Sequence, residues 1–375
     1  VKAAFKYRLY PTKAQAQFLD RELREACDLY NCAKQERDDA WKTCHKRINY
    51  YDQANQLKAI RADGCLTLAN FSCCQDVLRR MDRTYKAFYA RVQRGEKKVG
   101  FPRYRSARRY DSITFPSYGD GCRLLDTGKL RVQGAGHIKV KLHRPVEGAI
   151  KTVTIKREAG RWFVVFSVER DSSSLPASTA EIGIDVGLTS FAVLSNGAEI
   201  ENPRYYRKAE ARLRRCQRKV ARRKKGGNRR RKAVRLLQCA HVHVGNQRRD
   251  FQHKISRKLV NKYGIIAVED LNVKGLAGGM LAKSVHDAGW SQFLNYIAYK
   301  AADAGREVVK VDSRGTSQTC VCGARVPKTL ADRWHDCPAC GLSAGRDHVS
   351  AQLILQRGRS ARSSANVEVV VSCVA

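Results

Sequence analysis

The sequence predicts a multidomain chain of β and α/β class, in which a small β-barrel is interrupted by a helical bundle and followed by a mixed α/β domain. Three observations predict this order. Apolar side chains recur at three- and four-residue spacing over about residues 12–95, which is typical of amphipathic helices. Residues 112–168 form short strand-like runs separated by Gly and Pro. Beyond residue 182, strand-like and helical segments alternate, which indicates an α/β layer fold.

The first strand and the bundle are predicted from local patterns. Residues 5–10 alternate apolar or aromatic side chains with basic ones, as a half-buried strand does, and Pro11 ends this run. Thr12 and Gln15 have the spacing of a capping box, which opens a helix. A second helix is predicted over about residues 74–92. We expect the barrel to comprise residues 1–11 and 100–171, the helical bundle residues 12–99, and a linker residues 172–176.

The α/β domain is predicted over residues 177–357. It contains a long basic helical hairpin over about residues 205–263, broken at Gly226-Gly227-Asn228, and a cysteine-rich segment at residues 316–344. Residues 358–375 are Ser- and Arg-rich at first, and we expect them to form a disordered tail. The strands of this domain are predicted at residues 182–185, 190–194, 265–268 and 307–311, and two further helices at residues 289–304 and 348–356.

The charge of the chain indicates its class of partner. Lys and Arg number 72 against 35 Asp and Glu, which gives a net charge of +37. Self-repulsion on this scale favours a polyanionic partner, so nucleic acid is expected. A membrane-surface protein and a basic structural protein are the alternatives, but no long apolar run or signal-peptide pattern is present. We expect no membrane partner, and the scattered cysteines favour a reducing compartment, the cytoplasm of a prokaryote.

Three acidic residues lie where metal-binding carboxylates are expected. Asp185 and Glu269 each end an apolar strand-like run, and Asp347 directly precedes a helix. A carboxylate at the inner end of a buried strand is costly unless a positive group meets it. The three could converge on two Mg²⁺ ions, which activate water and stabilise the leaving oxygen of a phosphodiester. Taken singly, Asp347 could equally be a helix N-cap and Glu269 a surface residue.

Four cysteines cluster like metal ligands. Cys337 and Cys340 form a C-x-x-C pair, and Cys320 and Cys322 form a second pair that is one residue shorter. Four thiolates suit one tetrahedral Zn²⁺, which would be structural because no ligand position remains for water. A site without metal, a redox role, or recruitment of His335 or Asp336 are the alternatives.

The three acids lie in motifs that resemble the RuvC segments of the TnpB family, transposon-encoded relatives of type V CRISPR effector nucleases. These motifs are Gly183-Ile184-Asp185-Val186-Gly187, Val268-Glu269-Asp270-Leu271-Asn272-Val273-Lys274-Gly275 and Arg346-Asp347. Shorter stretches resemble the family in the same order along nearly the whole chain: Arg8-Leu9-Tyr10-Pro11-Thr12, the segment from Lys97 to Arg105, Asp287-Ala288-Gly289-Trp290 and Thr316-Ser317-Gln318-Thr319-Cys320. Val349 departs from the pattern, because the family usually has Asn there.

The resemblance implies an RNA-guided DNA endonuclease. Its fold would be a wedge-like barrel, an inserted helical recognition lobe and a RuvC-like (ribonuclease-H-like) domain. Its partners would be a guide RNA derived from the transposon end and double-stranded target DNA, with no small-molecule substrate. It would recognise a short motif beside the target and cut by two-metal chemistry at Asp185, Glu269 and Asp347. The alternatives are a repressor with an inactive RuvC centre and a transposase that joins strands itself.

The basic hairpin is the leading candidate for contact with RNA or an RNA–DNA hybrid. A solvated charged face or a localisation signal would also explain it, but its apolar positions allow one side to dock. Family analogy alone suggests Tyr50, Asn70 and Gln75 as readers of the target-adjacent motif. The expected phosphate-binding residues are Arg222, Arg223, Lys224, Lys225, Arg229, Arg230, Arg231 and Lys232 in the hairpin, together with Arg103 and Arg105.

Overall fold

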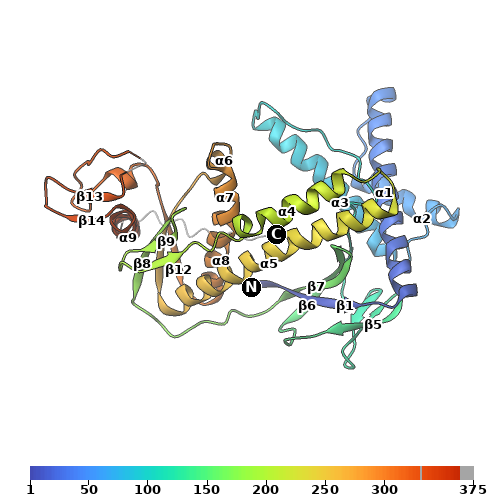
Figure 1. Ribbon diagram of the computed structural model, residues 1–375. Coiled ribbons are helices and arrows are strands. Elements are labelled where there is room, and N and C mark those ends of the chain that lie inside the picture. The colour runs from blue at the N-terminus through green and yellow to red at the C-terminus, as the bar shows by residue number, and fades with distance from the viewer. Residues whose placement is uncertain (330–331, 364–375) are drawn as a thin grey trace. The chain divides into compact units, whose positions relative to one another are not determined.

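The structure is a computed structural model that describes residues 1–329 and 332–363 (Figure 1). The chain divides into two compact units, one of residues 1–171 and one that begins at Ser172. The described helices include none that is long and apolar enough to cross a membrane.

The first unit contains a seven-stranded antiparallel sheet with the order β2-β6-β7-β1-β5-β4-β3. Alternate side chains of each long strand point inward, so Trp162, Val164, Phe166 and Val168 are buried along one strand. Because β1 lies between β7 and β5, the first residues of the chain form the middle of the sheet. The strands are β1 (Lys2–Tyr10), β2 (Ser112–Phe115), β3 (Cys122–Leu124), β4 (Lys129–Val132), β5 (Gly136–Lys141), β6 (Ala149–Glu158) and β7 (Arg161–Glu169).

Three helices cover this sheet: α1 (Lys13–Cys44), α2 (Tyr50–Ala62) and α3 (Phe71–Gln93). The predicted capping box is confirmed, because the Thr12 side chain accepts from the Gln15 backbone and Gln15 returns the bond. The helices share one hydrophobic core with the strands. The predicted small β-barrel is an open half-barrel: among the described strands, β2 and β3 remain unpaired edges of the sheet, and side chains of the helices share its core.

The second unit has a five-stranded mixed sheet with the order β10-β9-β8-β11-β12. Strand β11 is parallel to both of its neighbours, whereas β9 is antiparallel to β8 and to β10. This arrangement confirms the predicted mixed α/β class of the domain. The strands are β8 (Glu181–Val186), β9 (Ser190–Leu194), β10 (Glu199–Glu201), β11 (Ile265–Glu269) and β12 (Glu307–Val311).

Helices cover both faces of this second sheet. On one face Ile182, Ile184, Ile266 and Val268 pack against α5 (Asn228–Lys262) and α8 (Trp290–Asp303). The opposite face is covered by α9 (Arg346–Ser363). The remaining described elements of this unit are α4 (Tyr205–Ala221), α6 (Val273–Leu276), α7 (Ala282–Ala288), the short 3-10 helix η1 (Thr316–Gln318) and the hairpin strands β13 (Trp334–Asp336) and β14 (Ser343–Gly345).

Helix α9 corrects the prediction for the end of the chain. The predicted helix ended at residue 356, but α9 continues through Ser363, so the first six residues of the expected tail, 358–363, are helical. Tertiary contacts explain the extension: Gly358 packs on Ala267, and Arg359 and Arg362 both pair with Glu181. The remainder of the expected tail, residues 364–375, lies outside the described residues.

Candidate active site

The carboxylate site begins with a close approach between α9 and the sheet. Gly183 on β8 and Ala267 on β11 are register partners, so both point to the α9 face. A Cβ on Gly183 would lie 2.1 Å from the Ala351 carbonyl oxygen, so only glycine allows the helix this near. Leu355 packs beside the same glycine. The helix therefore runs along β8 in the opposite direction, with its first turn at the carboxyl ends of the strands.

All three predicted acids converge at this place. Side chains alternate along a strand, so Asp185 and Glu269 point to the same face as Gly183 and Ala267. Asp347 is in the first turn of α9, above the ends of these two strands. Glu269 is 8% exposed, and the other two acids are partly buried. Segments that are distant in the sequence thus supply one cluster of carboxyl groups.

The acids influence one another electrostatically. Burial raises the pKa of Asp185 well above its usual range, and the neighbouring charges of Glu269 and Asp347 raise it further. Burial also raises the pKa of Glu269, although a hydrogen bond from Thr316 opposes the shift. The two strand-end acids with raised pKa values would be stabilised in their ionised form by positive charge from a ligand.

Two polar residues that the sequence interpretation did not assign to the site contact these acids. The Thr316 hydroxyl donates to Glu269 Oε1 at 2.5 Å, and Arg346 Nε donates to Asp347 Oδ1 at 3.3 Å. Both residues belong to motifs that resemble the family, but nothing in their spacing predicts a contact with an acid.

The oxygen donor set fits Mg²⁺, because this ion prefers hard oxygen ligands and binds through few carboxylates plus water and phosphate. Among the described residues, the only group of three or more candidate ligands whose donor atoms all lie within 4.8 Å of one another is the cysteine cluster. The carboxylates are therefore more widely spaced than a single compact cage.

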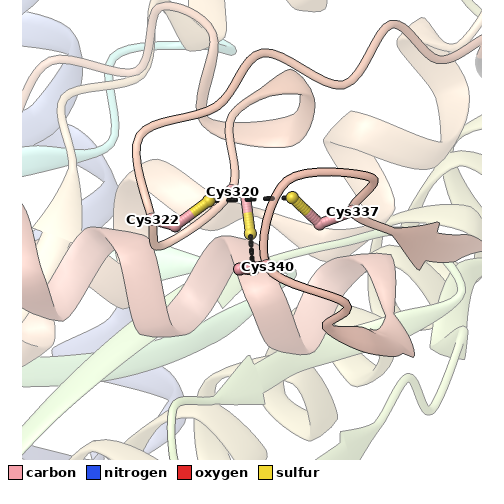
Figure 2. A group of neighbouring side chains, drawn as sticks. All are labelled: Cys320, Cys322, Cys337 and Cys340. Atoms are coloured by element: carbon pink, nitrogen blue, oxygen red, sulfur yellow. Dashed lines mark hydrogen bonds between the residues drawn. The ribbon is translucent and has the colours of Figure 1, made fainter.

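The four predicted cysteines form that compact group (Figure 2). The sulfur atoms of Cys320 and Cys340 lie 3.6 Å apart, as do those of Cys322 and Cys337. Figure 2 shows the four thiols gathered between two loops. The shortened Cys320-x-Cys322 pair thus reaches the same centre as the regular pair, and neither His335 nor Asp336 belongs to the group.

The pKa values of the clustered thiols shift in opposite directions. Backbone N–H groups, chiefly that of Cys340, lower the pKa of Cys337 to about 6, whereas burial raises the pKa of Cys320 to about 12. Zinc replaces the protons of such thiols when it binds. The tight grouping of four sulfur donors fits a structural Zn²⁺, and no ligand position is left for a reacting water.

The basic hairpin forms as predicted, from α4 and α5 around the turn at residues 222–227. A small core of Leu213, Ala240 and Val244 joins the two helices, so the basic side chains face solvent. Arg230 is an exception among the predicted phosphate-binding residues, because its Nη1 donates to the carbonyls of Val220 and Arg223 at the end of α4. The exposed members are Arg222, Arg223, Lys224, Lys225, Arg229, Arg231 and Lys232.

Helix α7 holds the base of this hairpin. Arg204, the residue before α4, provides no side-chain cap, and the Asp287 carboxylate accepts instead from the backbone N–H groups of Tyr206 at 2.9 Å and Arg207 at 3.3 Å. On the other helix, Arg248 donates to the His286 carbonyl at 2.8 Å. The stretch from Asp287 to Trp290 resembles a family motif, but the sequence alone assigns it no role. The structure shows that its first residue, Asp287, helps to hold the base of the hairpin.

The three residues predicted to read the target-adjacent motif do not lie together in the first unit. Tyr50 and Gln75 line one cleft of about 760 Å³, together with Lys58, Arg79 and Arg83. Asn70 is outside this cleft: it caps α3 by accepting from the Cys73 N–H at 3.0 Å, and its amide nitrogen donates to Asp120 and Gln133.

The other predicted contacts of the first unit lie before β2. Arg103 and Arg105 are exposed. Phe101 and Tyr104 are about half exposed, whereas Tyr110 and Phe115 belong to the core. The exposed pair of aromatic rings thus lies in the same segment as the two arginines.

Three protein-family models match parts of the chain. Residues 154–279 match the OrfB_IS605 family model, described as "Probable transposase", and residues 290–354 match the model of the Cas12f1-like TNB domain. Residues 1–47 match the HTH_OrfB_IS605 model, described as a helix-turn-helix domain, although the structure has strand β1 and the single long helix α1 over most of this range.

Relatives match along most of the chain. A Streptomyces pristinaespiralis protein, provisionally named an RNA-guided DNA endonuclease, is 34% identical over 96% of this chain and 90% of its own length. InsQ of Escherichia coli K12, named in the same way, is 28% identical over 95% of this chain and 92% of its own length. The CRISPR-associated endodeoxyribonuclease Cas12f1 of Sulfoacidibacillus thermotolerans is 26% identical over 75% of each chain. The chain thus belongs to the OrfB/TnpB family of RNA-guided DNA endonucleases.

Proposed function

We propose that this chain cuts DNA phosphodiester bonds under RNA guidance, at a RuvC-like centre formed by Asp185, Glu269 and Asp347. The single observation that carries the proposal is their convergence. Two acids lie at the ends of adjacent strands, on the face that α9 covers, and the third lies at the first turn of that helix. The domain division proposed from the sequence, with residues 177–357 as the nuclease domain, is part of the same proposal.

The three carboxylates would hold two Mg²⁺ ions. When bound, such ions lower the pKa of a coordinated water and stabilise the leaving oxygen of the phosphodiester. The chain itself supplies ligands held in place by the sheet and by α9. Because burial raises the pKa of Asp185, a positive charge beside this carboxyl group would favour its ionised form, which is the form that binds a cation.

Guide RNA and target DNA are the proposed partners, because the relatives are named as RNA-guided DNA endonucleases. The exposed positive residues of the hairpin would contact the phosphates of the RNA or of the RNA–DNA hybrid. In the first unit, the cleft containing Tyr50 and Gln75 would meet the short duplex motif beside the target, since its lysine and arginine side chains suit phosphate contact. The Asn70 side chain is already hydrogen-bonded to Cys73, Asp120 and Gln133, so we assign it a structural role and not one in reading the motif.

Cleavage of a plasmid that carries the target tests the proposal. The full chain would be produced with its guide RNA, which sequencing of the co-purified RNA identifies. We expect Asp185→Ala to abolish Mg²⁺-dependent cleavage and to bind the guide RNA as tightly as the native chain. Asp126→Ala is the matched control, because Asp126 is exposed in the turn between β3 and β4.

The outcomes separate the alternatives. Unchanged cutting by Asp185→Ala would refute the assignment of the site. A native chain that binds guide and target without cutting at any Mg²⁺ concentration would instead support the repressor. Joined DNA strands in the same reaction would support a transposase.

A further inference from the structure

The cysteine-rich segment begins and ends at the carboxylate site. Helix η1 ends two residues before Cys320, and α9, with Asp347 as its second residue, directly follows β14 of the same segment. The segment that holds the proposed zinc is therefore tied to the nuclease centre at both ends, through Thr316 at the first and Arg346 at the second.

At the first end, Thr316 holds Glu269. Thr316 is 6% exposed, and its hydroxyl donates to Glu269 Oε1 at 2.5 Å. The hydroxyl also lies 3.1 Å from the Ser313 carbonyl oxygen, but its one proton favours the nearer oxygen, that of Glu269. The Ser350 hydroxyl of α9 donates to the Thr316 carbonyl at 3.4 Å. This arrangement occupies one oxygen of Glu269 and leaves the other for a ligand.

At the second end, Arg346 connects the segment to Asp347. Its Nη1 donates to the carbonyls of Thr329 at 3.3 Å and Asp332 at 2.9 Å, and its backbone N–H donates to the Arg333 carbonyl at 2.9 Å. Its Nε donates to Asp347 Oδ1 at 3.3 Å. One guanidinium thus contacts both the loop of the segment and the third acid.

We propose that Thr316 and Arg346 are positioning residues through which the folded cysteine knuckle sets the geometry of the nuclease carboxylates. This inference rests on the proposed function of Asp185, Glu269 and Asp347. Second-layer hydrogen bonds orient metal ligands, and their loss typically costs about 10- to 100-fold in metal affinity or activity. If the knuckle unfolds, the contacts of Thr316 with Glu269 and of Arg346 with Asp347 are both lost. The nuclease centre therefore depends on a folded zinc site that takes no part in the chemistry.

The test for Thr316 compares three variants of the full chain. Thr316→Val removes the hydroxyl at nearly constant volume, Thr316→Ser keeps it, and Ser317→Ala is a matched hydroxyl deletion at an exposed neighbouring position. Two measurements are made: the Mg²⁺ concentration that gives half-maximal cleavage, and the Mn²⁺ affinity of the free protein by calorimetry, with Asp185→Ala as the blank. We expect Thr316→Val to weaken both by about tenfold or more, and the other two variants to match the native chain.

The test for the knuckle uses Cys337→Ser, which removes a thiol from the cysteine group. We expect this variant to lose zinc and to bind Mn²⁺ more weakly at the carboxylates, while its affinity for guide RNA stays unchanged. Combined with Thr316→Val, its further effect on Mn²⁺ affinity should be smaller than in the native background, because both changes break the same connection. Arg346→Met should weaken Mn²⁺ binding in the same way at unchanged zinc content.

The outcomes distinguish this inference from the function on which it rests. If Asp185→Ala keeps native Mn²⁺ affinity, the carboxylate site itself is wrong. If Asp185→Ala loses Mn²⁺ binding but Thr316→Val and Arg346→Met keep the native affinity and Mg²⁺ dependence, the carboxylate site stands and the positioning role is wrong. Additive effects of Cys337→Ser and Thr316→Val would contradict the coupling to the knuckle.

Discussion

The two candidate metal centres of the second unit are built in opposite ways. The cysteine group draws its four ligands from residues 320–340, and their sulfur atoms lie close together in two loops. The carboxylate group draws its ligands from three distant segments, and they meet only because β8, β11 and α9 pack against one another. The first kind of site depends on local chain folding and the second on the packing of the whole domain.

The hairpin repeats this contrast on a larger scale. Its exposed positive residues are neighbours in the sequence around one turn, whereas the residue that caps its base, Asp287, comes from a helix far along the chain. A substitution in the cysteine group or the hairpin turn should therefore change only zinc binding or RNA binding. A substitution at the carboxylates or at Asp287, where distant segments meet, should change stability as well as function.

The largest effect is expected at the packed site. Asp185→Asn should reduce cleavage below detection, because it removes a ligand charge at the centre of the three acids. The same substitution should raise the melting temperature of the metal-free protein at neutral pH, where the native carboxylate is costly to ionise. Plasmid cleavage measures the first effect and thermal denaturation the second, and in the melting experiment Mn²⁺ should stabilise only the native chain.

The sign of the pH dependence follows from the raised pKa of Asp185. A buried acid with a raised pKa favours the folded state while it is protonated, and this contribution is lost as the pH rises through the folded-state pKa. The stability advantage of Asp185→Asn should therefore be absent at pH about 3, below the unfolded-state pKa, and should grow as the pH rises. An advantage that is constant with pH would contradict the assigned environment.

At the local metal site, Cys322→Ser should reduce the zinc content from about one per chain to near zero, because four thiolates complete the tetrahedral site. Asp336→Asn is the control, because Asp336 lies in the same segment outside the cysteine group. Elemental analysis of the purified chain measures the result. Full zinc retention in Cys322→Ser would show that the shortened pair is not a ligand pair.

The hairpin turn should respond to salt. Replacing Arg222, Arg223, Lys224 and Lys225 together by Gln should weaken RNA binding and reduce the slope of log affinity against log salt by about one for each phosphate that is no longer bound. Melting temperature should be unchanged, because these side chains are exposed. Arg230→Gln is the structural counterpart: it should lower stability, because Arg230 donates to carbonyls at the end of α4.

The smallest effect is expected at the base of the hairpin. Asp287→Ala should destabilise the domain by about 0.5–2 kcal/mol, the usual cost of a lost helix cap, and Asp287→Asn should recover part of it. Hydrogen exchange at the Tyr206 and Arg207 amides should accelerate in Asp287→Ala. Unchanged exchange there would contradict the capping role.

Local patterns in the sequence were enough to identify the parts of this protein. Strand alternation, the capping box at Thr12 and the two helices of the basic hairpin all appear in the structure as expected. The cysteine group was also predictable, because its ligands are close in the chain. Each of these features depends on residues within a few turns or strands of one another, so the pattern itself contains the information.

Only the tertiary structure decided how these parts act together. The acids were recognisable as candidates, but their meeting depends on Gly183 and Ala267 admitting α9, and their contacts with Thr316 and Arg346 had no pattern in the sequence. The open sheet, the extension of α9 to Ser363 and the internal bonds of Asn70 were missed for the same reason. Each arises from packing between distant segments, whose energy depends on shape and distance rather than on the order of residues in the chain.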